Sequence, residues 1–176
     1  MHFAKSRLAA AFLVLLFSIA CDRKSTYEWH TFEPSDGTFS VSLPGDGVEV
    51  DRPTKSVTGG SFISHAFEIR ASKDAVYGCS WWEDASRPKD ETDEQILDRA
   101  RDSGLSGTDA KLLSENKITL QGHPGRDVRA IARGNAAYDN RLVVVGNRLY
   151  TLLVIDQSGK HDSDSIGKFF NSLQFR

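Results

Sequence analysis

The chain has 176 residues and a formal net charge of −2, from 22 basic and 24 acidic side chains. This length suits one domain of ordinary size. The balanced, slightly acidic composition offers no basic footprint for nucleic acid and no polybasic patch for a membrane surface. We therefore expect no nucleic-acid partner, and any attachment to a membrane must have another origin.

The first twenty residues have the layout of an export signal. Lys5 and Arg7 form a short positive region, and an apolar stretch of 13 residues follows over 8–20. A helix needs roughly 20 apolar residues to cross a bilayer, so this stretch is too short to span it. We interpret residues 1–20 as a signal peptide and expect an exported protein.

The end of this signal allows two modes of processing. Cys21 directly follows Ala20, which resembles a bacterial lipoprotein signal in which the cysteine is lipidated and becomes the mature N-terminus. Ser18 departs from that pattern, which usually has leucine there, and Ser-x-Ala also fits ordinary secretory cleavage. We favour a lipidated Cys21, with 21–28 as N-terminus and tether and a membrane anchor in the cell envelope. The alternative is a soluble periplasmic or secreted protein.

The chain has one other cysteine, Cys79. If Cys21 carries lipid, Cys79 is a lone thiol in an oxidising compartment, and burial in a strand would keep it inert. If Cys21 is unmodified, a disulfide between residues 21 and 79 is an open alternative, although the sequence cannot show that the two meet.

Extended segments dominate the mature chain. Residues 29–44 contain two runs joined by Asp36-Gly37, a dipeptide typical of hairpin turns. Residues 45–61 are rich in Gly, Pro, Asp and Thr and predict a long loop, with one short extended piece at 48–50. Further strands are predicted, in chain order, over 62–70, 75–82, 111–120, 125–133, 138–145 and 148–155.

Two segments predict helices. In "TDEQILDRARDSG", Thr92 and Gln95 fit a capping box, and Gly104 suits a C-terminal stop. In the second helix, Asp162 or Ser163 can cap the start, and apolar residues recur at helical spacing: Ile166, Phe169, Phe170 and Leu173. Strands, helix, strands and helix in this order predict an α+β domain, a mostly antiparallel sheet flanked by helices.

Several phrases carry a resemblance to a known family. They are "W-x-x-F…P-x-D-G-x-F-S-V-S-L-P-G", "ILDRAR", "L-x-G-x-P-G-R-D", "VVVGNRLYTLLV" and "FFNSLQF". Together they resemble the PsbP-like superfamily, an α/β/α sandwich found in photosystem extrinsic subunits, a Ran-binding nuclear import factor and many exported bacterial proteins. The resemblance covers 29–176 and implies one domain there. It also implies a docking or stabilising role more than catalysis, and no family binding residue can be placed on this sequence.

The sharpest cluster of reactive side chains lies in "QGHPGRDVRA". His123 could act as a general base oriented by Asp127, with Arg126 holding an anion. Against this, Pro124-Gly125 predicts a turn, and strand alternation puts Arg126 and Asp127 on opposite faces. We favour a structural role and keep His123 and Arg126 as candidate contacts to a partner or ligand.

Trp81 and Trp82 are consecutive strand residues and face opposite sides of a sheet. We favour core packing for both, with Trp82 as a candidate contact because tryptophan is enriched in interface hot spots. The sequence has no nucleophile motif. Four histidines of the mature chain, His30, His65, His123 and His161, lack metal-ligand spacing. We expect no catalytic residue, no metal and no cofactor.

The resulting hypothesis is an exported, lipid-anchored, non-catalytic binding or adaptor protein of the bacterial cell envelope. Its partner would be an envelope protein or a small ligand. Two alternatives stay open. A carrier of a small hydrophobic ligand predicts a closed apolar pocket lined by residues such as Trp82 or Phe169. An enzyme predicts a cleft in which His123 meets a carboxylate near Arg126.

Overall fold

The computed structural model describes residues 28–55, 61–83, 88 and 90–176. The predicted signal peptide, Cys21 and the tether up to residue 27 lie outside the described residues. The elements occur in the order β1 (Trp29–Phe32), β2 (Phe39–Pro44), β3 (Val48–Lys55), β4 (Ser61–Arg70), β5 (Ala75–Glu83), α1 (Asp93–Gly107), β6 (Lys111–Leu120), β7 (His123–Ala132), the short 3₁₀ turn η1 (Arg133–Asn135), β8 (Ala136–Val145), β9 (Arg148–Asp156), α2 (Ser163–Asn171) and β10 (Gln174–Phe175).

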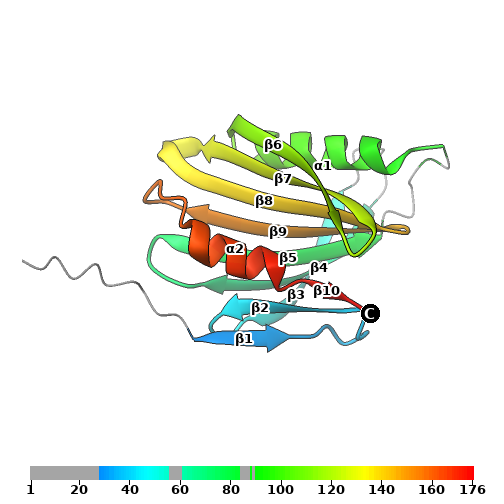
Figure 1. Cartoon of the computed structure of the whole chain (residues 1–176), viewed down its shortest axis with the longest axis horizontal. Helices are drawn as coiled ribbons and strands as arrows, with labels where there is room; N and C mark the ends of the chain where they lie inside the picture. The colour runs from blue at the N-terminus through cyan, green and yellow to red at the C-terminus, as the bar shows by residue number, and fades with distance from the viewer. Residues whose placement is uncertain (1–27, 56–60, 84–87, 89) are drawn as a thin grey trace, which may run out of the picture.

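Two antiparallel sheets and two helices form the layers. The large sheet has seven strands in the order β3-β4-β5-β9-β8-β7-β6, and the small sheet has the order β1-β2-β10. Helix α1 packs on one side of the large sheet, which we call the α1 face (Figure 1). Helix α2 and the small sheet pack on the other side, the α2 face (Figure 1). The predicted α+β class, a mostly antiparallel sheet flanked by helices, is confirmed.

The prediction of a loop over 45–61 with one short extended piece at 48–50 is wrong for residues 51–55 and 61, which are strand residues, and residues 56–60 lie outside the described part. Residues 48–55 form β3, which pairs with β4 in unbroken register from Val48↔Glu68 to Lys55↔Ser61. Because β3 is the outermost strand, its outer edge makes no ladder, and an edge strand tolerates Pro53. The proline and polar residues that suggested a loop here are instead those of an exposed edge strand.

The predicted turn at Pro124-Gly125 is also wrong. The chain reverses at Gln121 and Gly122, whose φ angles are +51° and +87°, and His123 already begins β7. Gly125 has a different task, because a Cβ there would lie 2.5 Å from the carbonyl oxygen of Leu142 on β8. Its missing side chain allows two strands to approach closely.

Both helices begin where the sequence predicted, but α1 does not end at the predicted residue. Thr92 and Gln95 form the predicted capping box, and Asp162 caps α2. Helix α1 continues through Gly104 to Gly107. A Cβ at Gly104 would lie 2.6 Å from the Tyr138 hydroxyl, so this glycine makes room for a buried side chain of the sheet.

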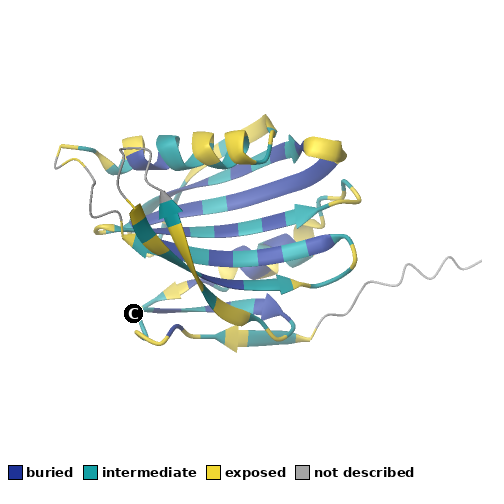
Figure 2. Cartoon of the chain, turned by 180° about the vertical axis from the view of Figure 1, so that it is seen from behind, coloured by how far each residue is buried: buried dark blue, intermediate teal, exposed yellow. Residues whose placement is uncertain are grey.

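The larger core lies between the α2 face, α2 and the small sheet. It is made of residues that alternate along β2, β5 and β9, together with the apolar stripe of α2. Cys79 is at its centre with 0% exposure, as expected for a buried strand residue, and burial raises the pKa of its thiol far above the ordinary value. A smaller core fills the space beneath α1. Figure 2 shows how buried and half-buried residues alternate along the strands.

Candidate functional site

Arg126 lies in a cluster of ion pairs beneath one edge of α1. Its guanidinium contacts Asp98 (2.5 Å), Glu94 (2.7 Å) and Glu115, and only 4% of the residue is exposed. Arg101 also binds Glu115, at 2.8 Å. Burial alone would lower the pKa of Arg126, but the three carboxylates outweigh it and raise the pKa. The structure therefore places Arg126 in an internal network that joins α1 to β6 and β7.

The three reactive side chains of "QGHPGRDVRA" do not form one site. Arg126 is on the α1 face, whereas Asp127 is on the α2 face, where Arg141 binds both of its carboxylate oxygens at 2.7 Å. The His123 ring contacts Phe175 edge to face, with centroids 5.5 Å apart. Among the described residues His123 has no hydrogen bond or ion pair with a carboxylate, so the base–orienter pair that catalysis would need is not formed.

The two tryptophans point to opposite faces. Trp81 is 3% exposed in the larger core, where it contacts Phe39 and Phe67. Trp82 is only half-buried on the α1 face, and its ring stacks on Phe62 with centroids 5.9 Å apart and planes 16° from parallel. It also packs against the buried residues under the first turns of α1, among them Leu97. Trp82 is thus a rigidly held aromatic ring at the border of a covered region.

The α1 face is only partly covered. Helix α1 packs on β7 and β8 and runs along one side of the sheet (Figure 2), so β5 and β9 lie beside it. Apart from Leu149 of β9, which is buried against α1, their residues on this face are half-buried, and we call these half-buried residues the β5–β9 strip. The strip consists of Val76, Gly78, Ser80 and Trp82 from β5 and Thr151, Leu153 and Ile155 from β9. The first three pair in register with Ile155, Leu153 and Thr151, and Trp82 pairs with the buried Leu149.

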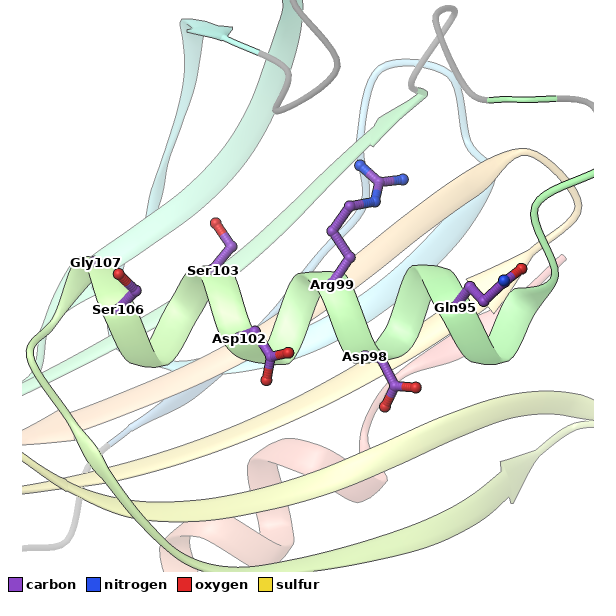
Figure 3. Close-up of a pocket in the computed structure, with 7 residues that line it drawn as sticks. All are labelled: Gln95, Asp98, Arg99, Asp102, Ser103, Ser106 and Gly107. Carbon is purple, nitrogen blue, oxygen red and sulfur yellow. The ribbon is translucent and has the colours of Figure 1, made fainter.

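The strip has apolar ends, a small polar middle and charged borders. Beyond β5, Arg52 donates to both carboxylate oxygens of Glu68 at 2.6 Å, and Glu68 is the register partner of Gly78. On α1, Figure 3 shows Arg99 and Ser103 on the helix edge opposite Asp98. Since Asp98 faces Arg126 on β7, the other edge is turned toward the strip. Such an apolar patch with a charged rim is typical of protein interaction surfaces.

A shallow depression along the outside of α1 is not a site of the same quality. Its lining comes from a single helix, from Gln95 to Gly107 (Figure 3). One helix provides one wall, and a ligand there could not be enclosed as small-molecule sites require. We therefore assign it no role.

Two buried polar atoms, one in the strip and one beside it, have no hydrogen-bond partner among the described residues. They are Oδ1 of Asn140 and Oγ1 of Thr151, on neighbouring strands of the α1 face. The amide of Asn140 donates to the Tyr138 hydroxyl at 2.9 Å, which leaves its oxygen unpaired. An unpaired buried polar group costs about 1–3 kcal/mol. The interface between the sheet and α1 therefore contains two buried oxygen atoms whose hydrogen-bonding capacity is unused.

One histidine meets two carboxylates that sequence spacing could not reveal. Possible ligand atoms of Glu49, Asp51 and His65 all lie within 4.8 Å of one another. The grouping arises because Asp51 is the register partner of His65 on the neighbouring strand. His65 Nδ1 lies 2.6 Å from Asp51 and both carboxylates are exposed, so an ordinary surface hydrogen bond accounts for the arrangement.

Comparisons with known proteins give a structural likeness. No family model and no curated protein matches the chain. Among solved structures, the chain is similar to the solution structure of PsbP (CyanoP) from the cyanobacterium Synechocystis, with a TM-score of 0.58 and 11% identity. The match covers 89% of this chain and 98% of that one. In agreement with the sequence motifs, this chain has a PsbP-like α+β fold.

Proposed function

We propose that this chain is an exported, non-catalytic binding protein of the bacterial cell envelope, anchored to the membrane through lipidated Cys21. Its partner is a polypeptide segment of another envelope protein, bound along the β5–β9 strip. The observation that carries the proposal is the half-covered α1 face, where Trp82 forms one end of the β5–β9 strip between charged rims. A buried aromatic anchor with a polar rim is the usual anatomy of a protein interface.

The state of the reactive side chains favours binding over catalysis. The thiol of Cys79 is fully buried and its raised pKa opposes thiolate formation. The guanidinium of Arg126 is engaged in ion pairs with three carboxylates, and the His123 ring contacts an aromatic ring. The enzyme alternative required a cleft in which His123 meets a carboxylate near Arg126, and the described residues do not form that arrangement.

The shape of the strip favours a polypeptide over a small molecule. Small ligands bury about 70–90% of their surface in a pocket, which a strip open along its length does not offer. On β5 the strip runs from Val76 to Trp82, and at about 3.3 Å per residue step this is roughly 20 Å. The carrier alternative also named Phe169 as a pocket wall, but Phe169 is 0% exposed and fills the core against Tyr77.

The anchor would hold the domain close to the membrane. No helix among the described residues is long and apolar enough to cross a bilayer. Seven residues, 22–28, lie between Cys21 and Trp29 at the start of β1, and the eight residue steps from Cys21 to Trp29 span at most about 28 Å. In the Cys21-anchored protein, the start of β1 therefore stays within about 28 Å of the lipidated residue.

Site-specific photo-crosslinking in the native envelope tests the binding surface. A photoreactive residue at Ser80, inside the strip, should give a discrete protein adduct. The same residue at Ser114, a strand serine on the α2 face, should not. Gly78→Gln fills the strip without a clash, since a Cβ there meets nothing closer than 3.7 Å, and it should abolish the Ser80 adduct. Equal adducts from both positions, or one indifferent to Gly78→Gln, would refute the assignment.

Intact mass spectrometry tests the anchor separately. The envelope-extracted protein should carry a diacylglyceryl-sized mass that disappears in Cys21→Ala, and the variant should move to the soluble fraction. If the two proteins differ only by the cysteine-to-alanine mass, the lipid anchor is wrong and the soluble alternative holds.

A further inference from the structure

A cleft on the α2 face lies between α2 and strands β6, β7 and β8, on the side of the large sheet opposite the β5–β9 strip. It has a volume of about 340 Å³, near the lower end of the range for small-molecule sites. Unlike the depression on α1, it has walls from four different elements. The cleft is therefore a built concavity that the proposed protein-binding surface does not use.

Two cross-strand ion pairs inside the cleft differ in one respect. Asp127 pairs with Arg141 and Arg129 pairs with Asp139, each directly across β7 and β8. Arg141 uses Nε and Nη2 to hold both oxygens of Asp127 at 2.7 Å. Arg129 donates only from Nε, at 2.9 Å, because Nδ1 of His161 lies 2.6 Å from the other oxygen of Asp139.

The consequence is an unpaired guanidinium fork. The two Nη groups of Arg129 have no partner among the described residues, and 42% of its side chain is exposed. The Asp139 carboxylate that holds it is only 5% exposed, so the fork is fixed by a buried support. A guanidinium kept merely to neutralise Asp139 would be expected to bind it with two donors, as Arg141 binds Asp127.

The rest of the cleft leaves room for a ligand beside this fork. Ser114 and Asn116 on β6 line it, and neither side chain has a hydrogen-bond partner in the part of the chain that the structure describes. On the opposite wall, Gly167 lies inside α2, and a Cβ there would meet nothing within 4 Å. Glycine inside a helix costs about 1 kcal/mol relative to alanine, and here it leaves the helix wall hollow.

We propose that this cleft binds a small monocarboxylate. Its carboxylate accepts two hydrogen bonds from Nη1 and Nη2 of Arg129, and its remaining atoms lie between Ser114 and Gly167. The planar fork matches the two oxygens of a carboxylate. Asp127 and Asp139 also line the cleft, so a dianion such as phosphate meets more repulsion there than a single negative charge.

An NMR titration of the full mature domain with sodium acetate, at constant ionic strength maintained with chloride, tests the proposal. Acetate should give saturable shifts of the Ser114 and Gly167 amides with a Kd on the order of millimolar. Arg129→Gln should abolish the saturation. Arg133→Gln, a charge-matched control at an 83% exposed side chain four residues away, should leave the Kd unchanged.

A second variant guards against an indirect effect of losing the Arg129–Asp139 pair. Gly167→Leu keeps every ion pair and fills the hollow in α2, so it should weaken acetate at least tenfold without unfolding the protein. The proposal is overturned if acetate shifts saturate in Arg129→Gln or Gly167→Leu as in the unmodified protein. It is equally overturned if phosphate binds as tightly as acetate, or if no concentration of acetate gives saturation.

Discussion

Replacing Arg126 by methionine would test whether this arginine holds the fold together or serves a ligand. Methionine keeps the length of the side chain beneath α1 but removes the charge shared by Glu94, Asp98 and Glu115. Removing one partner of a fully buried ion pair costs about 3–5 kcal/mol. Here Glu94 and Asp98 have side chains about half exposed to water, so water compensates part of that loss.

The worked expectation is a loss of about 2 kcal/mol in the free energy of unfolding. For a domain of this size that corresponds to a drop of about 4–8 °C in Tm. Arg126→Ala should lose more, about 3–4 kcal/mol, because a cavity is added to the lost charge. Arg133→Met, at an exposed position, should stay within about 0.5 kcal/mol of the parent protein. Urea unfolding at neutral pH measures all three.

The same cluster gives a pH signature. Hydrogen bonding to Lys117, and then to Arg126, lowers the pKa of Glu94. A carboxyl whose folded pKa is depressed contributes stability above its unfolded pKa of about 4.3 and loses it as pH falls through the folded value. The gap between the parent protein and Arg126→Met should therefore narrow from pH 7 to about pH 3. A gap below about 0.5 kcal/mol at pH 7, or one that widens in acid, would refute the structural role of Arg126.

Three further predictions concern packing and burial. Thr151→Val replaces an unpaired buried hydroxyl by a methyl group and should stabilise the protein by about 1 kcal/mol in urea unfolding; a loss of that size would show that the hydroxyl is bonded after all. Gly104→Ala should destabilise by about 1–3 kcal/mol despite alanine's higher helix propensity, because its methyl overlaps a buried tyrosine hydroxyl. Gly107→Ala, where a Cβ meets nothing within 4 Å, should be neutral or stabilising by up to about 1 kcal/mol, and equal effects at both glycines would contradict the packing explanation. Cys79 should resist a thiol reagent at pH 8 in the native state and react fully in urea when the other cysteine is replaced by alanine; rapid native labelling would mean that the core opens there.

The sequence predicted the elements whose signals are local. Period-two alternation in β2 and β5, the nearly unbroken apolar run of β9 and the capping box of α1 each arise within a few residues, so chain chemistry alone reveals them. Only the first three residues of β3 were predicted as extended, because an edge strand lacks a buried face and tolerates proline and polar residues. The turn was placed three residues late because Pro124-Gly125 has turn composition, whereas Gly125 is required by the close approach of β8.

The candidate sites depended on contacts between distant segments. Alternation along the strand separated Arg126 from Asp127 at the sequence level, and the structure places them on opposite faces. Nothing in the sequence indicated that Arg126 would meet three carboxylates, because Glu94 and Asp98 come from a helix that precedes its strand by many residues. The sequence also could not predict the unpaired guanidinium fork of Arg129, since it depends on His161 binding Asp139, the aspartate that pairs with Arg129.

By itself, the sequence determined the α+β class, the export signal hypothesis and the separation of the two faces within each strand, because these follow from periodicity and composition along the chain. Only the tertiary structure decided which face α1 leaves half-covered and which charged groups remain unpaired. Those properties depend on strand order, register and helix placement, which bring together residues that share no local pattern. The β5–β9 strip and the cleft beside Arg129 are products of that assembly.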